Sequence, residues 1–515
     1  MHEPSQPHES LPIEQVLRSQ STHNTNTSTI PSRSSTNRAW LGFENLEREV
    51  AFDDVPVRGS IPTWLTGALY RNGSGKTDAG QQRVAHWYDG MSLLQRFAFN
   101  NGSVSYRNRF LRSNMYTVAR ETGNIGFKGF ATDPCGALLG AMKAEYMHSD
   151  SENANINIGC VAGQILALAE PPMAVQFDPV TLETLGTFRP EQFVGPLIPG
   201  QTSTPHPQRD FVSNQLINYN AVMSQNSVYI IHSTDRLTGA RHIISTLPVS
   251  NPAYMHTFSM TEHYVILAEY PLRVNLRELQ SGKPFFASYH WHPESPTRFL
   301  VVRKNDGQQV ATLEAAPFLA LHHINAFERG QGPTAELVVD VAAYEDATHI
   351  TDFYLDKREA GAPLHTGQFR RYTLPLSSTH AEYEVLTSDL IELPTIDYRR
   401  RNARAYRYAY GASMRADLSE PMYNQLVKVD VHHRQSTTWF EDGCFPSEGI
   451  FVPAPDATDE DDGVLLSMVL DTRTHSSFLL VLDAHTFIER GRAVVPVPVP
   501  YSIHGQFLSD DYATI

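Results

Sequence analysis

Four histidines stand in segments that otherwise suit buried β-structure. His256 lies in "NPAYMHTFSMTEHYVILAEYPL" (251–272), and the other three lie in "STPHPQRD" (His206), "LHHINAFERG" (His322) and "YSIHGQFL" (His504). A histidine in a core strand is either a hydrogen-bonded core residue or a metal ligand, because a neutral imidazole nitrogen binds transition metals well. We hypothesise that these four imidazoles meet at one metal ion.

The spacing of these histidines limits the architectures that could bring them together. They are separated by 50, 66 and 182 residues, and no short motif such as HExxH links them. They can meet only if each lies on a different structural unit and the units converge on an axis, as the blades of a propeller do. His322 and His323 are adjacent, and neighbours on a strand point to opposite faces, so at most one of them can face a common centre.

The chain is rich in the short strands that such an architecture requires. Gly, Pro, Asn and Asp separate β-type runs such as "SVYIIHS", "HIISTLPV", "YVILAEY", "RFLVVRK", "AELVVDVAAY", "GVLLSMVL" and "SFLLVLDA". Helical periodicity is scarce, with one helical apolar stripe at 136–147. Many short, evenly spaced strands indicate an all-β sandwich, barrel or propeller, and the length of the ordered region without an obvious linker favours the propeller.

The first residues differ in composition from the rest of the chain. Residues 1–38 are rich in Ser, Thr, Asn and Gln, which is typical of a flexible arm. Residues 39–515 then read as a single domain.

Composition also restricts the partners and the compartment. The formal net charge of −15 argues against nucleic acid as the main partner. Three cysteines without zinc or disulfide spacing indicate a reducing, intracellular compartment. The N-terminus lacks the pattern of a secretory signal, and no apolar run reaches the roughly 20 residues of a membrane helix. We therefore expect a cytoplasmic protein, with peripheral membrane contact as an added alternative.

Several segments together resemble one known family. They are "LTGALYRNGSGK" (65–76), "HWYDGMSLLQRFAF" (86–99), "FDPVTLETLG", "HHINAFE", "FPSEGIFVP" and "EDDGVLLSMVLD". In these motifs the chain resembles the carotenoid cleavage oxygenases from about residue 40 to its end, and is most similar to the branch of animal retinoid enzymes and their microbial relatives. The resemblance implies a seven-bladed β-propeller with a cap of loops and short helices over the axis.

The resemblance also implies a metal centre. One non-haem Fe(II) per chain would be held by four histidines, which map onto His206, His256, His322 and His504. The family pattern H-x-x-N-A-x-E selects His322 over His323. Four ligands leave two positions of an octahedral ion open, for O2 as co-substrate and for an alkene beside it. The expected reaction cleaves one conjugated C=C bond and gives two carbonyl products.

Three glutamates of the family map onto this chain as well: Glu170 in "LALAE", Glu392 in "IELPTID" and Glu448 in "FPSEGIF". Four neutral imidazoles would leave the charge of a divalent ion uncompensated in a poorly hydrated cavity. We therefore expect these carboxylates just outside the ligands, where they accept the free N–H of the histidines and fix their tautomers.

The substrate stays open between two classes at this point. We expect a carotenoid or an apocarotenoid; the alternative is a phenolic alkene, such as the stilbene resveratrol, or isoeugenol or 4-vinylguaiacol cleaved to vanillin. Phe110 and Lys143 are the expected substrate-binding residues, although stilbene-cleaving relatives have a Tyr where this chain has Phe110. The segment 136–147 either touches a membrane or packs on the propeller. A second alternative is a metal-free propeller that acts as a binding scaffold, and the oligomeric state is left open.

Overall fold

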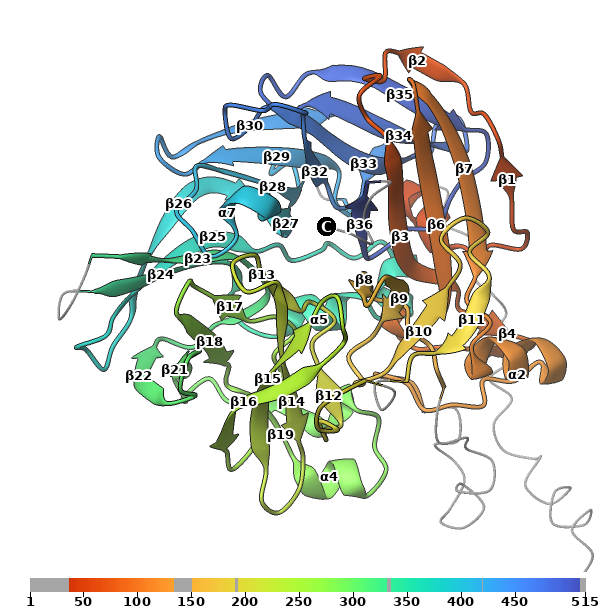
Figure 1. Ribbon diagram of the computed structural model, residues 1–515. Helices are drawn as coiled ribbons and strands as arrows, with labels where there is room; N and C mark the ends of the chain where they lie inside the picture. The colour runs from red at the N-terminus through yellow and green to blue at the C-terminus, as the bar shows by residue number, and fades with distance from the viewer. Residues whose placement is uncertain (1–36, 134–150, 190–192, 331–334, 419, 510–515) are drawn as a thin grey trace, which may run out of the picture. The chain divides into compact units, whose positions relative to one another are not determined.

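The computed structural model describes residues 37–133, 151–189, 193–330, 335–418 and 420–509. Apart from Asn37, these residues all belong to one compact unit, Arg38–Ile515. Seven antiparallel sheets of this unit are arranged around one axis, so that the all-β, seven-bladed propeller is confirmed (Figure 1). Of the predicted arm, residues 1–36 lie outside the described residues.

Three blades form the first part of the ring. Blade 1 contains β1 (Ala51–Phe52), β7 (Ser103–Phe110), β6 (Met91–Asn100), β3 (Gly67–Lys76) and β36 (His504–Leu508). Blade 2 contains β11 (Thr184–Thr187), β10 (Ala174–Phe177), β9 (Gln164–Leu168) and β8 (Asn157–Val161). Blade 3 contains β12 (Thr202–Ser203), β13 (Gln208–Asp210), β14 (Gln215–Val222), β15 (Val228–Asp235) and β16 (Arg241–Pro248).

Four blades complete the ring. Blade 4 contains β17 (Ser259–Met260), β18 (Tyr264–Glu269), β21 (Thr297–Arg303) and β22 (Gln309–Ala315), and blade 5 contains β23 (Leu319–Arg329), β24 (Glu336–Tyr344), β25 (Gln368–Pro375) and β26 (Glu382–Leu390). Blade 6 contains β27 (Glu392–Thr395), β28 (Tyr408–Ser413), β29 (Gln425–Asp430) and β30 (Gln435–Phe440). Blade 7 contains β31 (Cys444–Pro446), β32 (Ile450–Pro453), β33 (Gly463–Asp471), β34 (Ser476–Asp483), β35 (Glu489–Val495) and β2 (Val57–Gly59). Two short hairpins, β4 (Asp78–Ala79) with β5 (Gln82–Arg83) and β19 (Leu272–Val274) with β20 (Tyr289–Trp291), lie outside the blades.

Burial of the strands follows their place in the blades. The middle strand β33, "GVLLSMVLD", is buried at every position after its first, because neighbouring blades cover both of its faces. The outermost strand β26, "EYEVLTSDL", begins with four exposed residues. The near-continuous apolar runs of the sequence therefore mark the middle strands of blades, as expected for strands that are buried on both sides.

The two ends of the described chain close the ring. The last strand, β36, pairs with β3 of the first blade, with Arg71 opposite Gly505 and Asn72 opposite His504. The early strand β2 pairs in turn with β35 of blade 7. Through this closure the first blade fixes the position of the last strand beside the axis (Figure 1).

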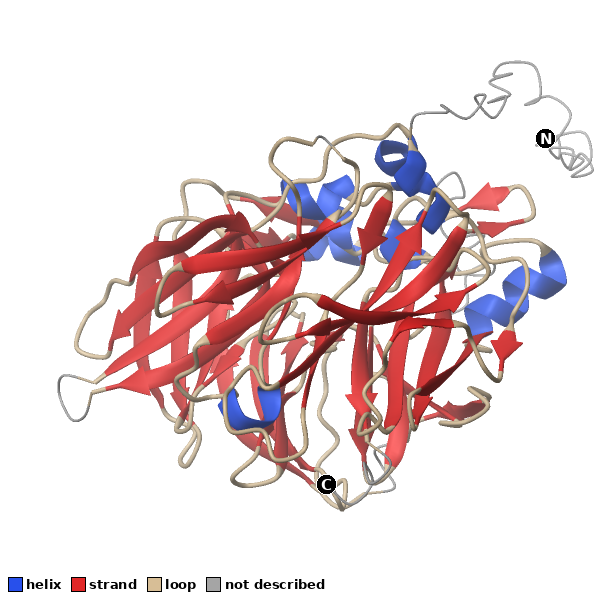
Figure 2. Ribbon diagram, turned by 90° about the horizontal axis from the view of Figure 1, so that it is seen from above, coloured by secondary structure: helices blue, strands red, loops and turns tan. Residues whose placement is uncertain are grey.

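The helices are short and most of them gather on one face of the ring (Figure 2). They are the 3-10 helices η1 (Arg38–Phe43), η2 (Trp87–Asp89) and η4 (Phe286–Ser288), and the α-helices α2 (Asn114–Thr122), α4 (Leu276–Gln280), α5 (Thr348–Asp352), α6 (Leu355–Glu359) and α7 (Tyr398–Arg401). The helix expected at 136–147 lies outside the described residues. Within the described ranges, no helix has the length and apolar character to cross a membrane.

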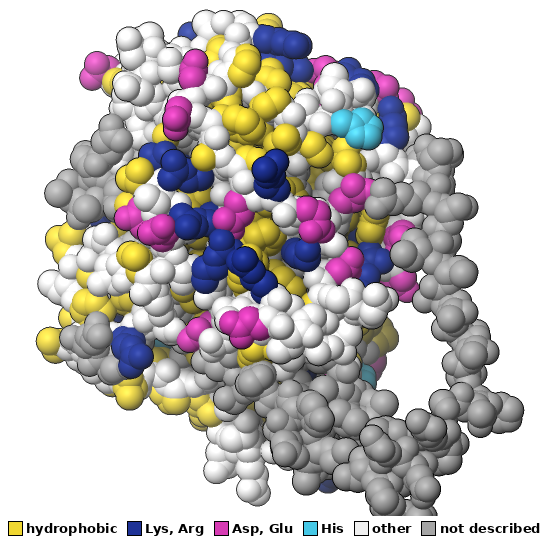
Figure 3. All heavy atoms as spheres, turned by 90° about the vertical axis from the view of Figure 1, so that its right-hand side faces the viewer, with side chains coloured by type: hydrophobic (Ala, Val, Ile, Leu, Met, Phe, Trp, Pro, Cys, Tyr) yellow, Lys and Arg dark blue, Asp and Glu magenta, His cyan; other side chains and the backbone are white. Residues whose placement is uncertain are grey.

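Polar contacts join neighbouring blades at the outer surface. Figure 3 shows the side of the molecule that lies at the right in Figure 1, with basic and acidic side chains interspersed. One contact between blades joins β7 of blade 1 to the β10–β11 turn of blade 2. There Arg109 lies 3.2 Å from Glu183 and donates to the carbonyl oxygen of Thr181. Such exposed pairs each contribute at most about 1 kcal/mol.

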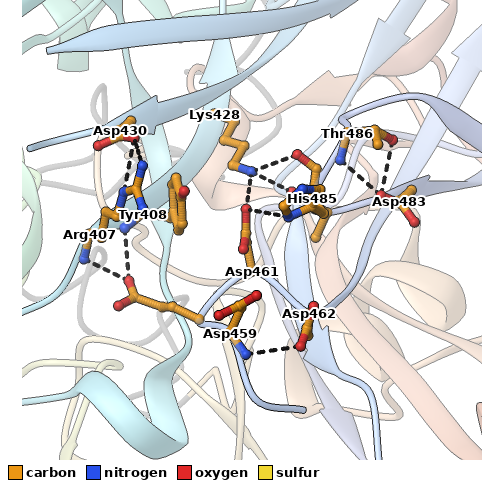
Figure 4. A network of polar contacts seen from close by, with 12 residues as sticks. Arg407, Tyr408, Lys428, Asp430, Asp459, Asp461, Asp462, Asp483, His485 and Thr486 are labelled. Atoms are coloured by element: carbon orange, nitrogen blue, oxygen red, sulfur yellow. Dashed lines mark hydrogen bonds and ion pairs between the residues drawn. The ribbon is translucent and has the colours of Figure 1, made fainter. Parts of the chain in front are cut away.

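A buried ion pair joins blades 6 and 7 (Figure 4). The Lys428 ammonium of β29 lies 2.6 Å from the Asp461 carboxylate and donates to the carbonyl oxygens of Ala484 and His485, at 2.8 and 2.9 Å. All three donors of the ammonium are thus satisfied. A buried pair with both charges satisfied is costly to break from one side only.

Candidate metal centre

The four histidines come from four different blades and converge at the axis. His206 lies between β12 and β13, His256 precedes β17, His322 lies in β23 and His504 begins β36. One ring nitrogen from each lies within 4.8 Å of those of the other three. The Nε2 atoms of His206 and His256 are 3.1 Å apart, as are those of His322 and His504.

Three glutamates come from the three remaining blades and contact three of the imidazoles. The Nδ1 atom of His256 lies 2.8 Å from Glu170, which follows β9 of blade 2. His322 Nδ1 hydrogen bonds Glu392, the first residue of β27 in blade 6. His504 Nδ1 lies 2.8 Å from Glu448, between β31 and β32 of blade 7. The seven blades thus each contribute one residue to the centre.

The carboxylates determine where the protons of these imidazoles lie. A carboxylate accepts a hydrogen bond, so Nδ1 of His256, His322 and His504 carries the proton and Nε2 carries a lone pair. The lone pairs of neighbouring Nε2 atoms then face each other at about 3 Å, which is unfavourable unless a cation lies between them. The donor set therefore fits a bound metal ion.

His206 has a different neighbour. Its Nδ1 atom lies 3.3 Å from the side-chain nitrogen of Asn157, which also donates to the carbonyl oxygen of Pro205. Its backbone N–H donates to the Thr204 hydroxyl, which in turn bonds the carbonyl oxygen of His256. The loop around His206 is thereby fixed to the loop of the next histidine without a carboxylate.

The adjacent pair on β23 divides between two sides of the strand. His322 joins the cluster, whereas the His323 ring is bonded by the hydroxyls of Ser259 and Tyr270, at 2.5 and 2.8 Å. Burial lowers the pKa of His323 to about 3, so this ring is a neutral core residue.

Burial favours the neutral, metal-binding form of two imidazoles of the cluster. It lowers the pKa of His206 and of His504, and the charges of the neighbouring imidazoles add to the effect. For Glu392, burial raises the pKa, but its contact with His322 and the hydrogen bond from the Tyr344 hydroxyl outweigh this effect and hold the pKa at about 2. Burial raises the pKa of Glu448 to about 7 against the charge of Arg71.

Each glutamate has a further partner that the sequence did not suggest. The Tyr254 hydroxyl donates to Glu170 and the Tyr344 hydroxyl to Glu392, both at 2.5 Å. Arg71 Nη1 donates to Glu448 at 2.6 Å. The only sequence signal for these residues is their position: Tyr254 stands two residues before His256, and Arg71 lies within the motif at 65–76.

A cavity of about 430 Å³ lies over the cluster, on the face where η2, α4 and α5 lie. Its lining includes three of the histidines and many apolar side chains, among them Trp87, Phe130, Ile156, Phe285, Phe353 and Met422. Its volume is within the usual range for small-molecule sites. A second cavity, of about 1110 Å³, reaches the cluster from the other face and is lined partly by α7 and by Asn157, Asn218 and Asp397.

Of the two residues expected to bind substrate, only Phe110 is among the described residues, and it lies away from the cavity of about 430 Å³ over the cluster. Phe110 ends β7 with its side chain buried in the core, stacked on Tyr116 at 5.2 Å, and it does not line the cavity. The alternation along β7 points it inward, against Leu93 of β6 and the backbone of Gly75. Lys143 lies outside the described residues.

Among the described residues, a second cluster of metal-binding residue types is neutralised by arginine side chains. Glu441, Cys444 and Asp471 lie close together. Arg473 pairs with both carboxylates, and Arg492 pairs with Glu441. We therefore assign this cluster a structural role.

Comparison with known proteins places the chain in a family. The model of the family described as "Retinal pigment epithelial membrane protein" matches residues 43–509. The chain is 35% identical over 490 residues to the carotenoid isomerooxygenase of Galleria mellonella, covering 88% of this chain and 93% of the relative. It is 30% identical over 510 residues to the β,β-carotene 15,15′-dioxygenase of Gallus gallus, covering 88% and 94%.

Solved structures agree with these relatives. The crystal structure of the cobalt-substituted apocarotenoid oxygenase of Synechocystis is similar with a TM-score of 0.81 and 25% identity, covering 92% of this chain and 98% of that one. The chain therefore belongs to the retinal pigment epithelial membrane protein family, that of the carotenoid cleavage oxygenases, and is an alkene-cleaving dioxygenase of the carotenoid-oxygenase type.

Proposed function

We propose that this enzyme holds one Fe(II) ion on its four histidines and uses O2 to cleave a conjugated C=C bond of a carotenoid or apocarotenoid. The observation that carries the proposal is the convergence of four imidazole Nε2 atoms beneath an apolar cavity. His206, His256, His322 and His504 are the proposed ligands. Glu170, Glu392 and Glu448 are the proposed residues that orient three of them.

The distances between the imidazole nitrogens support a first-row metal. With metal–nitrogen bonds of about 2.1 Å, ligands at right angles have nitrogens about 3.0 Å apart, and tetrahedral ligands about 3.4 Å. The Nε2 atoms are 3.1 Å apart in both the His206–His256 and the His322–His504 pair, closer to the right-angle value. Iron is the metal we propose because imidazole suits Fe(II), and because the similar solved structure is described as substituted with another first-row metal, cobalt.

The expected chemistry divides between the ion and the chain. A bound Fe(II) with open coordination positions would supply the electronic pathway that allows O2 to add to an alkene. The alkene supplies the electrons, so that one C=C bond and one O2 molecule become two C=O groups without a separate reductant. The chain's own contribution is to hold the alkene in place and to exclude water.

Aromatic side chains perform that binding role in the cavity. Phe130 stacks on Phe286 at 5.0 Å, and Tyr88 stacks on Phe353 at 5.4 Å. Tyr254 belongs to the same aromatic wall and is held by Glu170. Such rings provide a large apolar contact area for a rigid conjugated chain.

A carotenoid or apocarotenoid fits these observations better than a phenolic alkene. The relatives above are named for action on carotenoids, and the solved neighbour for action on apocarotenoids. A phenolic substrate would need a hydrogen-bonding partner for its hydroxyl, a role that a Tyr has in stilbene-cleaving relatives. Phe110 stands at the position of that Tyr, and it lies in the core, away from the cavity. A metal-free scaffold gives no reason for three carboxylates that direct imidazole lone pairs to one point.

The proposal is tested by metal analysis and an aerobic assay on the same preparation. We expect close to one iron per chain, and two carbonyl products with oxygen derived from ¹⁸O2 when β-apo-carotenals or β-carotene are supplied. Resveratrol and isoeugenol serve as comparison substrates. Protein without iron, or iron-loaded protein without oxygen uptake on any polyene, would contradict the proposal; faster cleavage of resveratrol or isoeugenol would reverse the choice of substrate class.

A further inference from the structure

A fully buried guanidinium lies beneath the cluster and contacts one of the three glutamates. Arg71 of β3 is 1% exposed. Its Nη1 donates to Glu448 Oε2 at 2.6 Å, and its Nε donates to the Ser502 hydroxyl at 2.9 Å. Its Nη2 donates to the carbonyl oxygen of Ile503 at 3.3 Å. Arg71 therefore contacts both the glutamate and the segment that leads into His504.

This contact differs in kind from those of the other two glutamates. Glu170 and Glu392 receive their additional hydrogen bonds from neutral tyrosine hydroxyls. Glu448 alone among the three is paired with a cation. Arginine stays protonated in proteins, so Arg71 brings a permanent positive charge to the centre.

The charges of the centre balance only when Arg71 is counted. A bound divalent cation and Arg71 both favour the ionised form of Glu448, so that the three carboxylates carry three negative charges, and the four imidazoles are neutral. A divalent ion supplies two positive charges and Arg71 supplies the third. Because charges in a buried site are poorly screened by solvent, a net charge there is costly.

We propose that Arg71 sets the redox balance of the metal centre by making the ferrous state the electrically neutral one. This inference rests on the proposed function, because it requires iron on the four histidines. Arg71 acts through Glu448 and touches neither substrate nor metal, so it is a positioning residue with an electrostatic role. Without its charge, loss of one electron by the ion would restore neutrality, and the ferric state would be favoured.

A purely structural role for Arg71 is the competing explanation. Arg71 lies opposite Gly505 in the β3–β36 pairing that closes the ring, so its replacement also weakens this strand pairing. A structural role and an electrostatic role differ in one respect. A lost structural contact cannot be restored by removing a second contact, whereas a lost charge can be balanced by removing the opposite charge.

The experiment is a redox titration of the iron-loaded protein with mediators, in which electron paramagnetic resonance measures the ferric fraction. At the wild-type midpoint potential, Arg71→Met should raise the ratio of ferric to ferrous iron at least tenfold, equivalent to about 59 mV for one electron. Glu448→Gln should lower the ratio at least tenfold. The double variant, again neutral in the ferrous state, should return to within about threefold of wild type. Arg71→Lys keeps the positive charge, so its ratio of ferric to ferrous iron should also stay within about threefold of wild type.

The outcomes separate this inference from the function on which it rests. A wild-type protein without iron contradicts the proposed function, whereas wild-type iron with equal midpoints in all variants overturns the role of Arg71. If both single variants shift the midpoint potential in the same direction and the double variant shifts it further, the role of Arg71 is structural, and the proposed electrostatic role is overturned. If Arg71→Met alone does not fold, the comparison of Glu448→Gln with the double variant decides. Adding Arg71→Met to Glu448→Gln must then reverse the shift in midpoint potential that Glu448→Gln produces.

Discussion

The Nδ1 atom of His504 lies 2.8 Å from Oε1 of Glu448, although 56 residues separate the two in sequence. The glutamate belongs to blade 7 and the histidine to the last strand, which completes blade 1. This hydrogen bond crosses the seam where the ring closes. His504 therefore belongs both to the candidate metal centre and to the strand that closes the propeller.

Glu448→Gln should weaken iron binding or turnover by roughly 10–100-fold, because the imidazole loses the carboxylate that orients it and raises its basicity. Iron affinity in competition with a chelator and kcat in the aerobic assay would measure the effect. Glu384→Gln is a matched control, since that glutamate is an exposed residue of β26 that forms an ion pair with Arg434 at the surface. An affinity and a rate equal to wild type would assign Glu448 to the fold alone.

His256→Ala should abolish iron loading and turnover, because it leaves three imidazoles and leaves Glu170 without its imidazole partner. Metal analysis of the purified variant would check the first effect and product formation the second. His290→Ala is the control, because that imidazole is exposed and pairs with Glu278 at the surface. Stoichiometric iron with full activity in His256→Ala would remove this residue from the proposed ligand set.

Local pattern was sufficient to predict the strands but not their convergence. The runs "GVLLSMVL" and "SFLLVLDA" became β33 and β34, because apolar β-branched and leucine residues suit strands covered on both sides. That His206 and His504 would meet could not be derived from a spacing of nearly three hundred residues. It came from the resemblance to a family, since tertiary position is set by the whole ring.

The partners of the glutamates lay beyond sequence reasoning for the same reason. Arg71 and Glu448 are 377 residues apart. The residues around an arginine in a strand do not indicate which distant carboxylate it will pair with. Phe110 stands on β7 where stilbene-cleaving relatives have a Tyr, and the structure places its side chain in the core, away from the cavity over the cluster. Proximity in such a ring follows from blade order, which short motifs do not encode.

Lys428→Met should destabilise the fold by about 3–5 kcal/mol, because it leaves Asp461 buried without a counter-charge (Figure 4). Urea unfolding of the iron-loaded protein would measure the loss. The control is Arg434→Met, which breaks an exposed ion pair with Glu384 and should cost at most about 1 kcal/mol. Equal effects of the two substitutions would show that the Lys428 pair does not stabilise the contact between blades 6 and 7.

Removal of residues 1–36 should leave iron content, turnover and unfolding unchanged, because their composition of Ser, Thr, Asn and Gln offers little apolar surface for packing. The cut belongs before Arg38, which begins η1 and pairs with Glu420 and Asp442. A longer deletion that also removes η1 should destabilise the protein, since Phe43 of that helix packs edge-on against Trp87 and Tyr501. Thermal unfolding and the aerobic assay on both truncations distinguish the two segments. Loss of activity already in the shorter truncation would show that the first residues contribute to the folded enzyme.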